Sequence, residues 1–222
     1  MLVSALEGHR IWADRYDVGC NPLLALETRL IRDVFSAVIA RNVLDVACGT
    51  GRWAAWFAAR GASVLGVDLC AEMLAQAPAR LHGRFALGRA EALPVAANTA
   101  DLTLCSFAAS YFPALETAIS EMARVTRHDG YLVISDVHPA AVAAGWTRSF
   151  RARDRVYEME HFGYTPDNLQ SAAQRAGLDF ETAVYGCFDE PERPAFEAAG
   201  RPERFAQVTG VPAVWIGKWR KA

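Results

Sequence analysis

In the stretch Asn42-Val-Leu-Asp-Val-Ala-Cys-Gly-Thr-Gly-Arg-Trp53, an apolar run is followed by small residues and then by a helical pattern. The run Val43–Val46 predicts a buried strand with one acid, Asp45, set into it. The small residues, two of them glycines, let the backbone turn tightly and let a ligand come close. Residues Arg52–Arg60 predict a helix. A strand, a glycine turn and a helix N-terminus form a nucleotide-type cradle, because the first amides of a helix are unpaired donors.

The size and charge of the chain limit the classes of protein to consider. Its 222 residues fit one large α/β domain, or one domain with a small lid. A composition of 52% hydrophobic and 22% charged residues supports a sizeable core and argues against disorder. The net charge of -2 gives no global basic field, so nucleic acid is not expected as a partner.

The cysteines and the N-terminus predict a cytoplasmic protein. The five cysteines are odd in number and scattered, so we expect free thiols in a reducing cytosol and no metal site. The first nine residues include acid and histidine and belong to no long apolar run. Neither a signal peptide nor a membrane span is therefore expected.

The rest of the chain continues the strand and helix pattern. Further strands are expected at 63–68, 83–89, 101–106 and 131–136, with helices at 71–80 and 113–126 between them. Residues 23–39 form an amphipathic helix pattern, which includes Ala37, ahead of the first strand. Another helix begins at Thr165, and two late strands at 178–188 and 212–219 are separated by a polar loop. Five strands alternating with helices predict a doubly wound parallel sheet covered on both faces.

This pattern predicts a single domain spanning residues 1–222. Residues 1–40 would be N-terminal cover helices and 41–137 the ligand-binding core. Residues 138–163, rich in arginine and aromatics, are too long for a simple connection, so they predict either a lid over the substrate or an irregular insertion. Residues 164–222 would supply the C-terminal helix and strands.

An acid at the end of the second strand points to the kind of ligand. Asp68 lies 17 residues beyond Gly51, and in a doubly wound sheet its carboxylate would lie beside the glycine turn. A carboxylate there suits the two hydroxyls of a ribose, although Asp68 could instead only cap the helix that follows.

The same turn formally matches the dinucleotide pattern G-x-G-x-x-A, so NAD has to be considered. Asp45 argues against it, because a negative charge beside a pyrophosphate would repel it. Trp53 also crowds the first helical turn, where a pyrophosphate needs open amides. An acid at that place suits a ligand that carries a cationic amine.

Five segments, in this order and spacing, resemble the class I S-adenosylmethionine-dependent methyltransferases. The resemblance covers about residues 40–137 and is closest to the small-molecule branch related to quinone-biosynthesis methyltransferases. The segments are Val43–Gly51, Gly66–Leu74, Arg89–Pro94, Asp101–Ser106 and Glu121–Gly130. The family's fold implies a Rossmann-like, mostly parallel seven-stranded sheet with helices on both faces, an antiparallel last strand, and a lid after the fifth strand.

The resemblance implies S-adenosyl-L-methionine as cofactor and S-adenosyl-L-homocysteine as product. Backbone around the glycine turn would pass the methionine end, the acid after the second strand would bind the ribose, and the third motif would border the adenine. The residues so implicated are Tyr16, Asp45, Ala47, Gly49, Gly51, Asp68, Leu69, Ala90, Glu91, Cys105 and Ser106. The sequence departs from the family in having Ala47 for the first glycine and Arg89 where an acid often meets the adenine.

The substrate side is predicted from the segments after the fourth and fifth strands. The signature of methyltransferases that act on amino groups of bases or glutamine is absent, and Cys105-Ser-Phe-Ala-Ala-Ser-Tyr111 replaces it. His138 follows the fifth strand as a candidate general base, or as a residue that caps the next segment. His161 and Tyr157 are further candidates. The residues expected to line the substrate are Tyr111, Trp146, Arg148 and Phe150.

The arginines from 148 to 155 have two interpretations: recognition of a substrate carboxylate or phosphate, or the solvated face of a lid. The leading hypothesis is methyl transfer to a small molecule, with O-methylation preferred because of His138. A non-catalytic cofactor-binding or partner-binding protein on the same fold is the alternative, and an NAD oxidoreductase comes third. A homodimer is one expected assembly.

Overall fold

The computed structural model describes residues 1–36, 38–78, 81, 84–152 and 154–222. Four sequence-based expectations touch residues outside this set. These are Ala37 in the first amphipathic pattern, Arg80 at the end of a helix, Gly83 at the start of a strand, and Arg153 in the lid.

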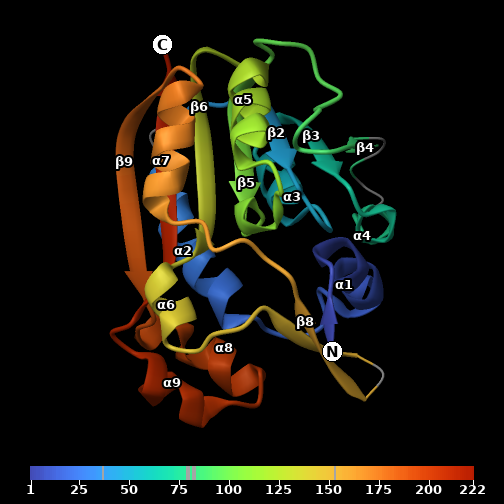
Figure 1. Ribbon diagram of the computed structural model, residues 1–222, viewed down its shortest axis with the longest axis vertical. Coiled ribbons are helices and arrows are strands. Elements are labelled where there is room, and N and C mark those ends of the chain that lie inside the picture. The colour runs from blue at the N-terminus through green and yellow to red at the C-terminus, as the bar shows by residue number, and fades with distance from the viewer. Residues whose placement is uncertain (37, 79–80, 82–83, 153) are drawn as a thin grey trace.

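A seven-stranded sheet forms the centre of the molecule (Figure 1). Its strands lie in the order β4-β3-β2-β5-β6-β10-β9. Strand β10 runs antiparallel to both of its neighbours, so the other six strands share one direction. The bounds are β2 (Asn42–Val46), β3 (Ser63–Asp68), β4 (Phe85–Leu87), β5 (Ala100–Ser106), β6 (Thr126–Val137), β9 (Leu178–Cys187) and β10 (Pro212–Lys221). This order and the antiparallel last strand confirm the expected fold.

Helices cover both faces of the sheet. Helices α5 (Leu115–Val125) and α7 (Pro166–Arg175) pack on one face, in front of the sheet in Figure 1. Helices α2 (Pro22–Ser36), α3 (Arg52–Ala58), α8 (Arg193–Ala198) and α9 (Pro202–Val208) pack on the other. In β6, Leu132 and Ile134 belong to the first core and Val133 to the second, as the alternation of side chains along a strand requires.

The register of the parallel strands aligns their carboxyl ends. Val46 pairs with Val67 of β3 and with Cys105 of β5, and Ser106 pairs with Ser135 of β6. The segments that follow these strands therefore meet at one edge of the sheet, which is where ligands bind in folds of this kind.

The connection between the two late strands is helical, so its prediction as a polar loop is wrong. A 3-10 turn, Glu190–Glu192, leads into α8 and α9. The prolines of this connection stand in the first turns of the helices, where a missing amide costs nothing. Phe196 and Phe205 bury the apolar sides of these helices.

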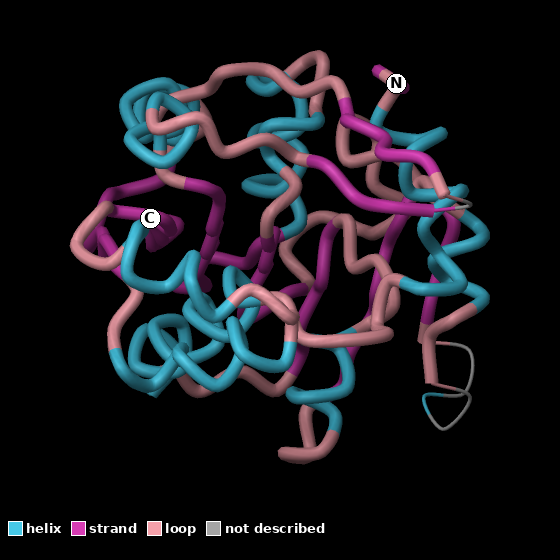
Figure 2. Tube along the Cα trace, turned by 90° about the horizontal axis from the view of Figure 1, so that it is seen from below, coloured by secondary structure: helices cyan, strands magenta, loops and turns pink. Residues whose placement is uncertain are grey.

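A second, three-stranded sheet joins the N-terminus to the expected lid. After α6 (Pro139–Ala143), the chain forms a hairpin of β7 (Ser149–Ala152) and β8 (Arg155–Met159). Strand β1 (Leu2–Val3) pairs in parallel with β8, and Figure 2 shows the N-terminal strand beside the hairpin. The division of the chain into cover, core, lid and C-terminal segments stays a prediction.

Helix α1 (Ala5–Trp12) follows β1 and contacts both β8 and α4 (Ala71–Ala75). A Cβ built on Gly8 would lie 2.5 Å from Met159 Cγ, so the helix approaches the hairpin closely where it has no side chain. The chain continues through the 3-10 turn Ala13–Arg15. Within the described ranges, no helix has the length and apolar character needed to cross a membrane.

Candidate functional site

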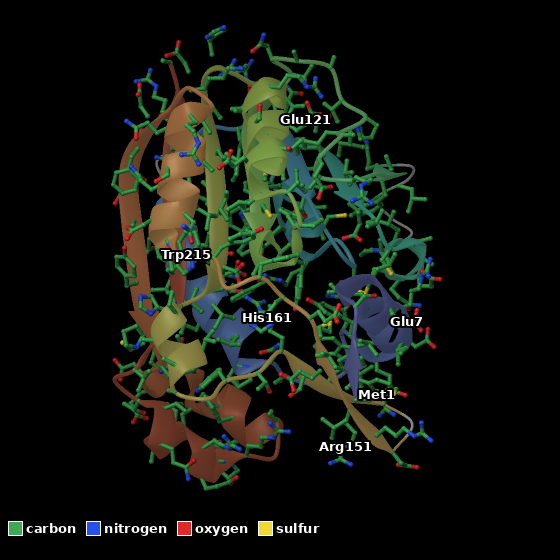
Figure 3. The ribbon with its side chains drawn as sticks, viewed as in Figure 1. Met1, Glu7, Glu121, Arg151, His161 and Trp215 are labelled. Atoms are coloured by element: carbon green, nitrogen blue, oxygen red, sulfur yellow. The ribbon has the colours of Figure 1, made fainter. Side chains whose placement is uncertain are left out.

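A cavity of about 500 Å³ lies at the carboxyl edge of β2, β3 and β5. One side, here called the cofactor wall, consists of Ala47, Gly49, Asp68, Leu69, Ala90 and Glu91. The aromatic wall consists of Phe107, Tyr111 and Phe112, which follow β5. The roof consists of Ser4, Ala5, Leu6 and His9 at α1 and of residues 160–162, which follow β8. Figure 3 labels His161 in this second segment.

The glycine turn after β2 brings bare backbone to the cavity. Ala47 and Gly49 have φ angles of 54° and 56°, in the left-handed region, and both line the cavity. Gly51 has a φ of 80° and caps the start of α3, but it faces away: a Cβ there would lie 2.7 Å from Phe85 Cζ. Gly51 therefore serves the packing of the turn against β4 and is not among the lining residues.

Asp68 lies at the cavity and also holds the glycine turn in place. One carboxylate oxygen accepts a hydrogen bond from the Gly49 amide at 2.7 Å, and the other accepts from the Cys70 amide at 2.8 Å. The capping contact anticipated for Asp68 is thus present, together with its placement at the cavity. Each oxygen keeps a second lone pair for a ligand.

The third motif borders the same cavity beyond Asp68. Ala90 is buried, and Glu91 forms an ion pair with Arg89 at 3.5 Å. All three residues line the cavity. Arg89, the departure from the family pattern, thus has its charge balanced by Glu91.

Asp45 is buried beneath the turn, with 2% of its surface exposed. Its carboxylate accepts a hydrogen bond from the Ala54 amide at 3.1 Å. Burial raises the pKa of Asp45 to about 7, although the nearby Arg52 acts in the opposite direction. Asp45 lines a smaller cavity of about 40 Å³, whose wall shares Tyr16, Ala47, Gly49, Ser106 and Phe107 with the larger one.

Tyr16 closes the junction of the two cavities. It lines both of them, and its ring lies edge-on to Trp12 at 4.7 Å between centroids. Burial raises the pKa of Tyr16 to about 12, so its hydroxyl stays protonated at neutral pH.

A buried acid that the sequence analysis missed lies behind Ser106. Glu27 of α2 has no exposed surface and accepts hydrogen bonds from the hydroxyls of Ser106, at 2.6 Å, and Ser135. Arg52 pairs with the same carboxylate. The sequence feature that points to Glu27 is an acid inside the apolar stripe of a helix, beside Leu26 and Leu30. This network directs the Ser106 proton away from the cavity.

Cys105, expected among the cofactor-binding residues, does not line the cavity. It has no exposed surface and packs in the core beneath α5 and α7. Because side chains alternate along a strand, Cys105 faces the core while Ser106, at the end of the strand, lines the cavity. Phe107, with a φ of 52°, continues that lining.

Arg148 is neither a solvated lid residue nor a free anion-binding group. Its side chain is only 12% exposed and pairs with Asp136 at the end of β6. Its guanidinium lies 5.0 Å from the centre of the Tyr111 ring, which does line the cavity. Arg148 itself is not a lining residue. Arg151 and Arg155 are exposed, as the solvated interpretation expects.

Four other residues expected at the substrate do not line the cavity. His138 begins α6, where its ring accepts a hydrogen bond from the Ala140 amide at 3.0 Å. Trp146 stacks on Phe188 at 5.5 Å. The hairpin turns its apolar side chains into a core of its own, which buries the remaining two, Phe150 and Tyr157. Of the three candidate bases, only His161 lines the cavity.

One cavity histidine was not anticipated. His9 lines the cavity from α1, and its ring lies edge-on to Tyr111 at 5.3 Å between centroids. His9, Trp12 and Tyr16 recur at the spacing of one helical stripe. This pattern is the sequence feature that points to His9. Among the described residues, no group of three or more His, Cys, Asp or Glu side chains could hold a metal ion.

Comparison with known proteins gives a consistent family. The model of the methyltransferase domain family matches residues 44–134. A demethylmenaquinone methyltransferase of Thermobifida fusca is 30% identical over 194 residues, which are 78% of this chain and 82% of that protein. The corresponding enzyme of Renibacterium salmoninarum is 36% identical over 133 residues, 57% of this chain, and the match spans about half of that relative, 56%.

Solved structures have the same fold. The crystal structure of an S-adenosylmethionine-dependent methyltransferase from Mesorhizobium loti matches with a TM-score of 0.69 at 21% identity. It covers 90% of this chain and all of that one, 100%. At this identity the likeness establishes the fold, whereas the similarity to the Thermobifida relative establishes the family. The chain belongs to the class I S-adenosylmethionine-dependent methyltransferases, the family whose cofactor is S-adenosylmethionine.

Proposed function

We propose that this protein transfers a methyl group from S-adenosylmethionine to a small apolar acceptor bound in the 500 Å³ cavity. The observation that carries the proposal is the pairing of two unlike surfaces in one cavity. The cofactor wall brings together Asp68, Glu91 and the glycine turn, and the aromatic wall faces the same space. The cavity is large enough for a ligand of drug size.

The residues of the cofactor wall fit the chemistry of the cofactor. S-adenosylmethionine supplies an electrophilic methyl group on a positively charged sulfur, next to a cationic amine. Asp68 and Glu91 line the larger cavity and Asp45 lines the smaller one. Each cavity also has an arginine in its lining, and both are paired: Arg89 with Glu91, and Arg52 with Glu27. A surface with this charge favours a cation over a pyrophosphate, which also argues against the NAD reading.

Each wall would have a separate task. The oxygens of Asp68 that already hold Gly49 and Cys70 have lone pairs left to accept bonds from ribose hydroxyls. The left-handed backbone at Gly49 allows close approach of the methionine end. Tyr16 would cover the bound cofactor, and Phe107 and Tyr111 would hold the acceptor and exclude water, so that acceptor and methyl group meet in line.

Calorimetric titration with S-adenosylmethionine, S-adenosylhomocysteine and NAD tests the cofactor assignment. We expect heat with both sulfur ligands and none with NAD. Heat with NAD alone would overturn the proposal. Transfer of labelled methyl from S-adenosylmethionine to small aromatic acceptors then tests activity, and binding without transfer to any acceptor would favour a non-catalytic role on the same fold.

A further inference from the structure

His9 is held in one tautomer by its own helix. Ser4 caps α1 by accepting a hydrogen bond from the Glu7 amide at 3.3 Å, and the helix then places His9 one turn after Ala5. The His9 Nδ1 atom lies 2.8 Å from the Ala5 carbonyl oxygen. Because a carbonyl oxygen only accepts, Nδ1 carries the proton and Nε2 has a free lone pair.

That lone pair has no partner among the residues that the structure describes. Across the described ranges, no hydrogen bond is made by Nε2 of His9, and Nε2 is not among the buried polar atoms without a partner. The ring lines the cavity and is fixed by Tyr111 at 5.3 Å and Tyr16 at 6.4 Å between centroids. Nε2 is therefore open to the cavity, and an oriented acceptor that a ligand can reach is what a proton transfer requires.

The surroundings keep the imidazole neutral. Burial lowers the pKa of His9, the hydrogen bond from Nδ1 to Ala5 and the charge of Asp68 act in the opposite direction, and Arg148 adds to the lowering. Arg148 is itself paired with Asp136. The titratable and charged groups that line the cavity with His9 or act on it are Tyr16, Asp68, Cys70, Arg89, Glu91, Tyr111, Arg148, Glu160 and His161.

The other histidines are less suited to this role. The Nδ1 atom of His138 accepts a hydrogen bond from the Ala140 amide, and His138 does not line the cavity. His161 lines the cavity, but its Nδ1 lies 3.4 Å from the Met159 carbonyl oxygen, a longer contact than that of His9. His161 also follows β8 on the roof, where its neighbours Glu160 and Phe162 are exposed.

We propose that Nε2 of His9 accepts the proton of the methyl acceptor, and that this acceptor is a neutral apolar molecule with an acidic hydroxyl, a phenol or an enol. The inference rests on the proposed function and deepens it. The hydroxyl proton passes to Nε2 while the acceptor oxygen bonds to the methyl carbon. The carbon–sulfur bond breaks, its electron pair stays on sulfur, and the imidazolium later returns its proton to water.

The walls of the cavity support a neutral acceptor. Phe107, Tyr111 and Phe112 offer flat apolar surfaces on which an aromatic ring packs. The cationic side chain that lines the cavity, Arg89, is paired with Glu91, so no charge is free for a substrate carboxylate among the described lining residues.

The first test reads the tautomer without any turnover. In protein labelled with 15N histidine and loaded with S-adenosylhomocysteine, His9 should show a protonated Nδ1 and an unprotonated Nε2 at about neutral pH. The signal missing from His9→Asn protein identifies the residue. A protonated Nε2 would overturn the proposal.

The second test compares His9→Asn with His128→Asn, using 2-naphthol as acceptor and 2-methoxynaphthalene as its counterpart without the hydroxyl. His128 is a suitable control because it is exposed and its Nδ1 also contacts a main-chain oxygen, that of Ala222. We expect kcat to fall about 10²–10⁴-fold in His9→Asn. The control should keep wild-type turnover, and added imidazole should restore part of the turnover of His9→Ala.

The pH profile and the affinity for S-adenosylhomocysteine separate the possible failures. Wild-type kcat should rise with pH through the pKa of His9 and then level off, because a protonated ring cannot accept a proton, and His9→Asn should lose this limb. No heat with S-adenosylhomocysteine in the wild type would overturn the proposed function itself. Normal binding with unchanged His9→Asn turnover would overturn the role of His9 alone. Binding of the cofactor product without binding or methylation of 2-naphthol would overturn the acceptor class.

Discussion

The two sides of the cavity are assembled in different ways. The cofactor wall comes from a continuous part of the chain, from Ala47 to Glu91, and its strands β2 and β3 are neighbours in both sequence and space. The roof joins the N-terminal helix α1 to residues after β8, which are about 150 positions away and meet it through the pairing of Val3 with Met159. Short motifs therefore specify the cofactor wall, whereas the roof depends on pairing between distant segments, which leaves no local pattern.

The largest effect expected on the cofactor side comes from the buried charge of Asp45. Its pKa of about 7 lies above the value near 4 of an unfolded chain, so the folded state binds the proton more tightly. Its contribution to the free energy of unfolding is full at low pH and is lost as pH rises to about 7. Asp45→Asn keeps an acceptor for the Ala54 amide and removes this dependence.

Relative to wild type, Asp45→Asn should therefore gain on the order of 2–3 kcal/mol in the free energy of unfolding between about pH 5 and about pH 8. Urea unfolding at both pH values measures this, with the exposed Asp179→Asn as a control that should show no such gain. A difference between variant and wild type that does not change with pH would show that Asp45 ionises freely in its site.

Next in size is the effect of Asp68→Ala on ligand binding. Loss of a charged hydrogen-bond partner should weaken binding of S-adenosylhomocysteine by about 1–3 kcal/mol. Asp68→Asn keeps one carbonyl oxygen for the Gly49 or Cys70 amide. Its affinity for S-adenosylhomocysteine, measured by calorimetry, should lie between those of wild type and Asp68→Ala. If Asp68→Ala binds S-adenosylhomocysteine as tightly as wild type, Asp68 only holds the glycine turn in place. The cofactor wall would then differ from the roof in how it is assembled, but Asp68 would have no role in binding.

Gly8→Ala tests how closely α1 packs against the hairpin that carries the roof, through its effect on the free energy of unfolding. The new methyl group would meet Met159, which is 3% exposed and has no room to move. Overpacking costs about 1–3 kcal/mol and exceeds the gain of about 1 kcal/mol in helix propensity. We expect a net loss of about 1 kcal/mol in stability, measured by urea unfolding.

Adding Met159→Ala should make the Gly8→Ala change favourable, because it removes the atoms in the way. The double-mutant cycle should give a coupling of about 0.5–3 kcal/mol. Simple additivity of the two changes would mean that α1 and the hairpin do not form one packed unit.

The smallest effect is expected at His138, the base proposed from sequence. Asparagine is a good N-cap, so His138→Asn should preserve the start of α6 and change the free energy of unfolding by less than about 0.5 kcal/mol. Turnover of 2-naphthol should stay at the wild-type rate. A large loss of turnover with unchanged stability would return His138 to the reaction.

The sequence predicts the cofactor wall well because its signals are local. The strand, the glycine turn and Asp68 follow each other at fixed spacing, and the register of parallel strands brings them together. Prediction from the sequence fails where the partner of a residue lies far away along the chain. The neighbouring arginines predict a solvated or anion-binding side chain at Arg148, whereas its environment is set by Asp136 and Tyr111.

The same reason accounts for His9 and for the late helices. The N-terminal pattern contains the His9 stripe, but only the packing of α1 against the sheet edge reveals that this stripe faces a cavity. In residues 189–211, prolines are typical of a loop, but Pro194 and Pro202 stand in the first turns of α8 and α9, and Pro191 stands in the 3-10 turn before them. Proline occurs both in loops and at the start of helices. The burial of Phe196 and Phe205 shows that this segment is helical.

The pairing of β1 with β8 also has a kinetic consequence. Contacts between segments so far apart form late in folding, because closing a long loop costs entropy before the contact compensates for it. The central sheet can therefore assemble while the roof is still open. Amide hydrogen exchange should report β1, α1 and β8 as one cooperative unit that opens more readily than β2 and β5, so that access to the cavity is governed by the opening of this unit.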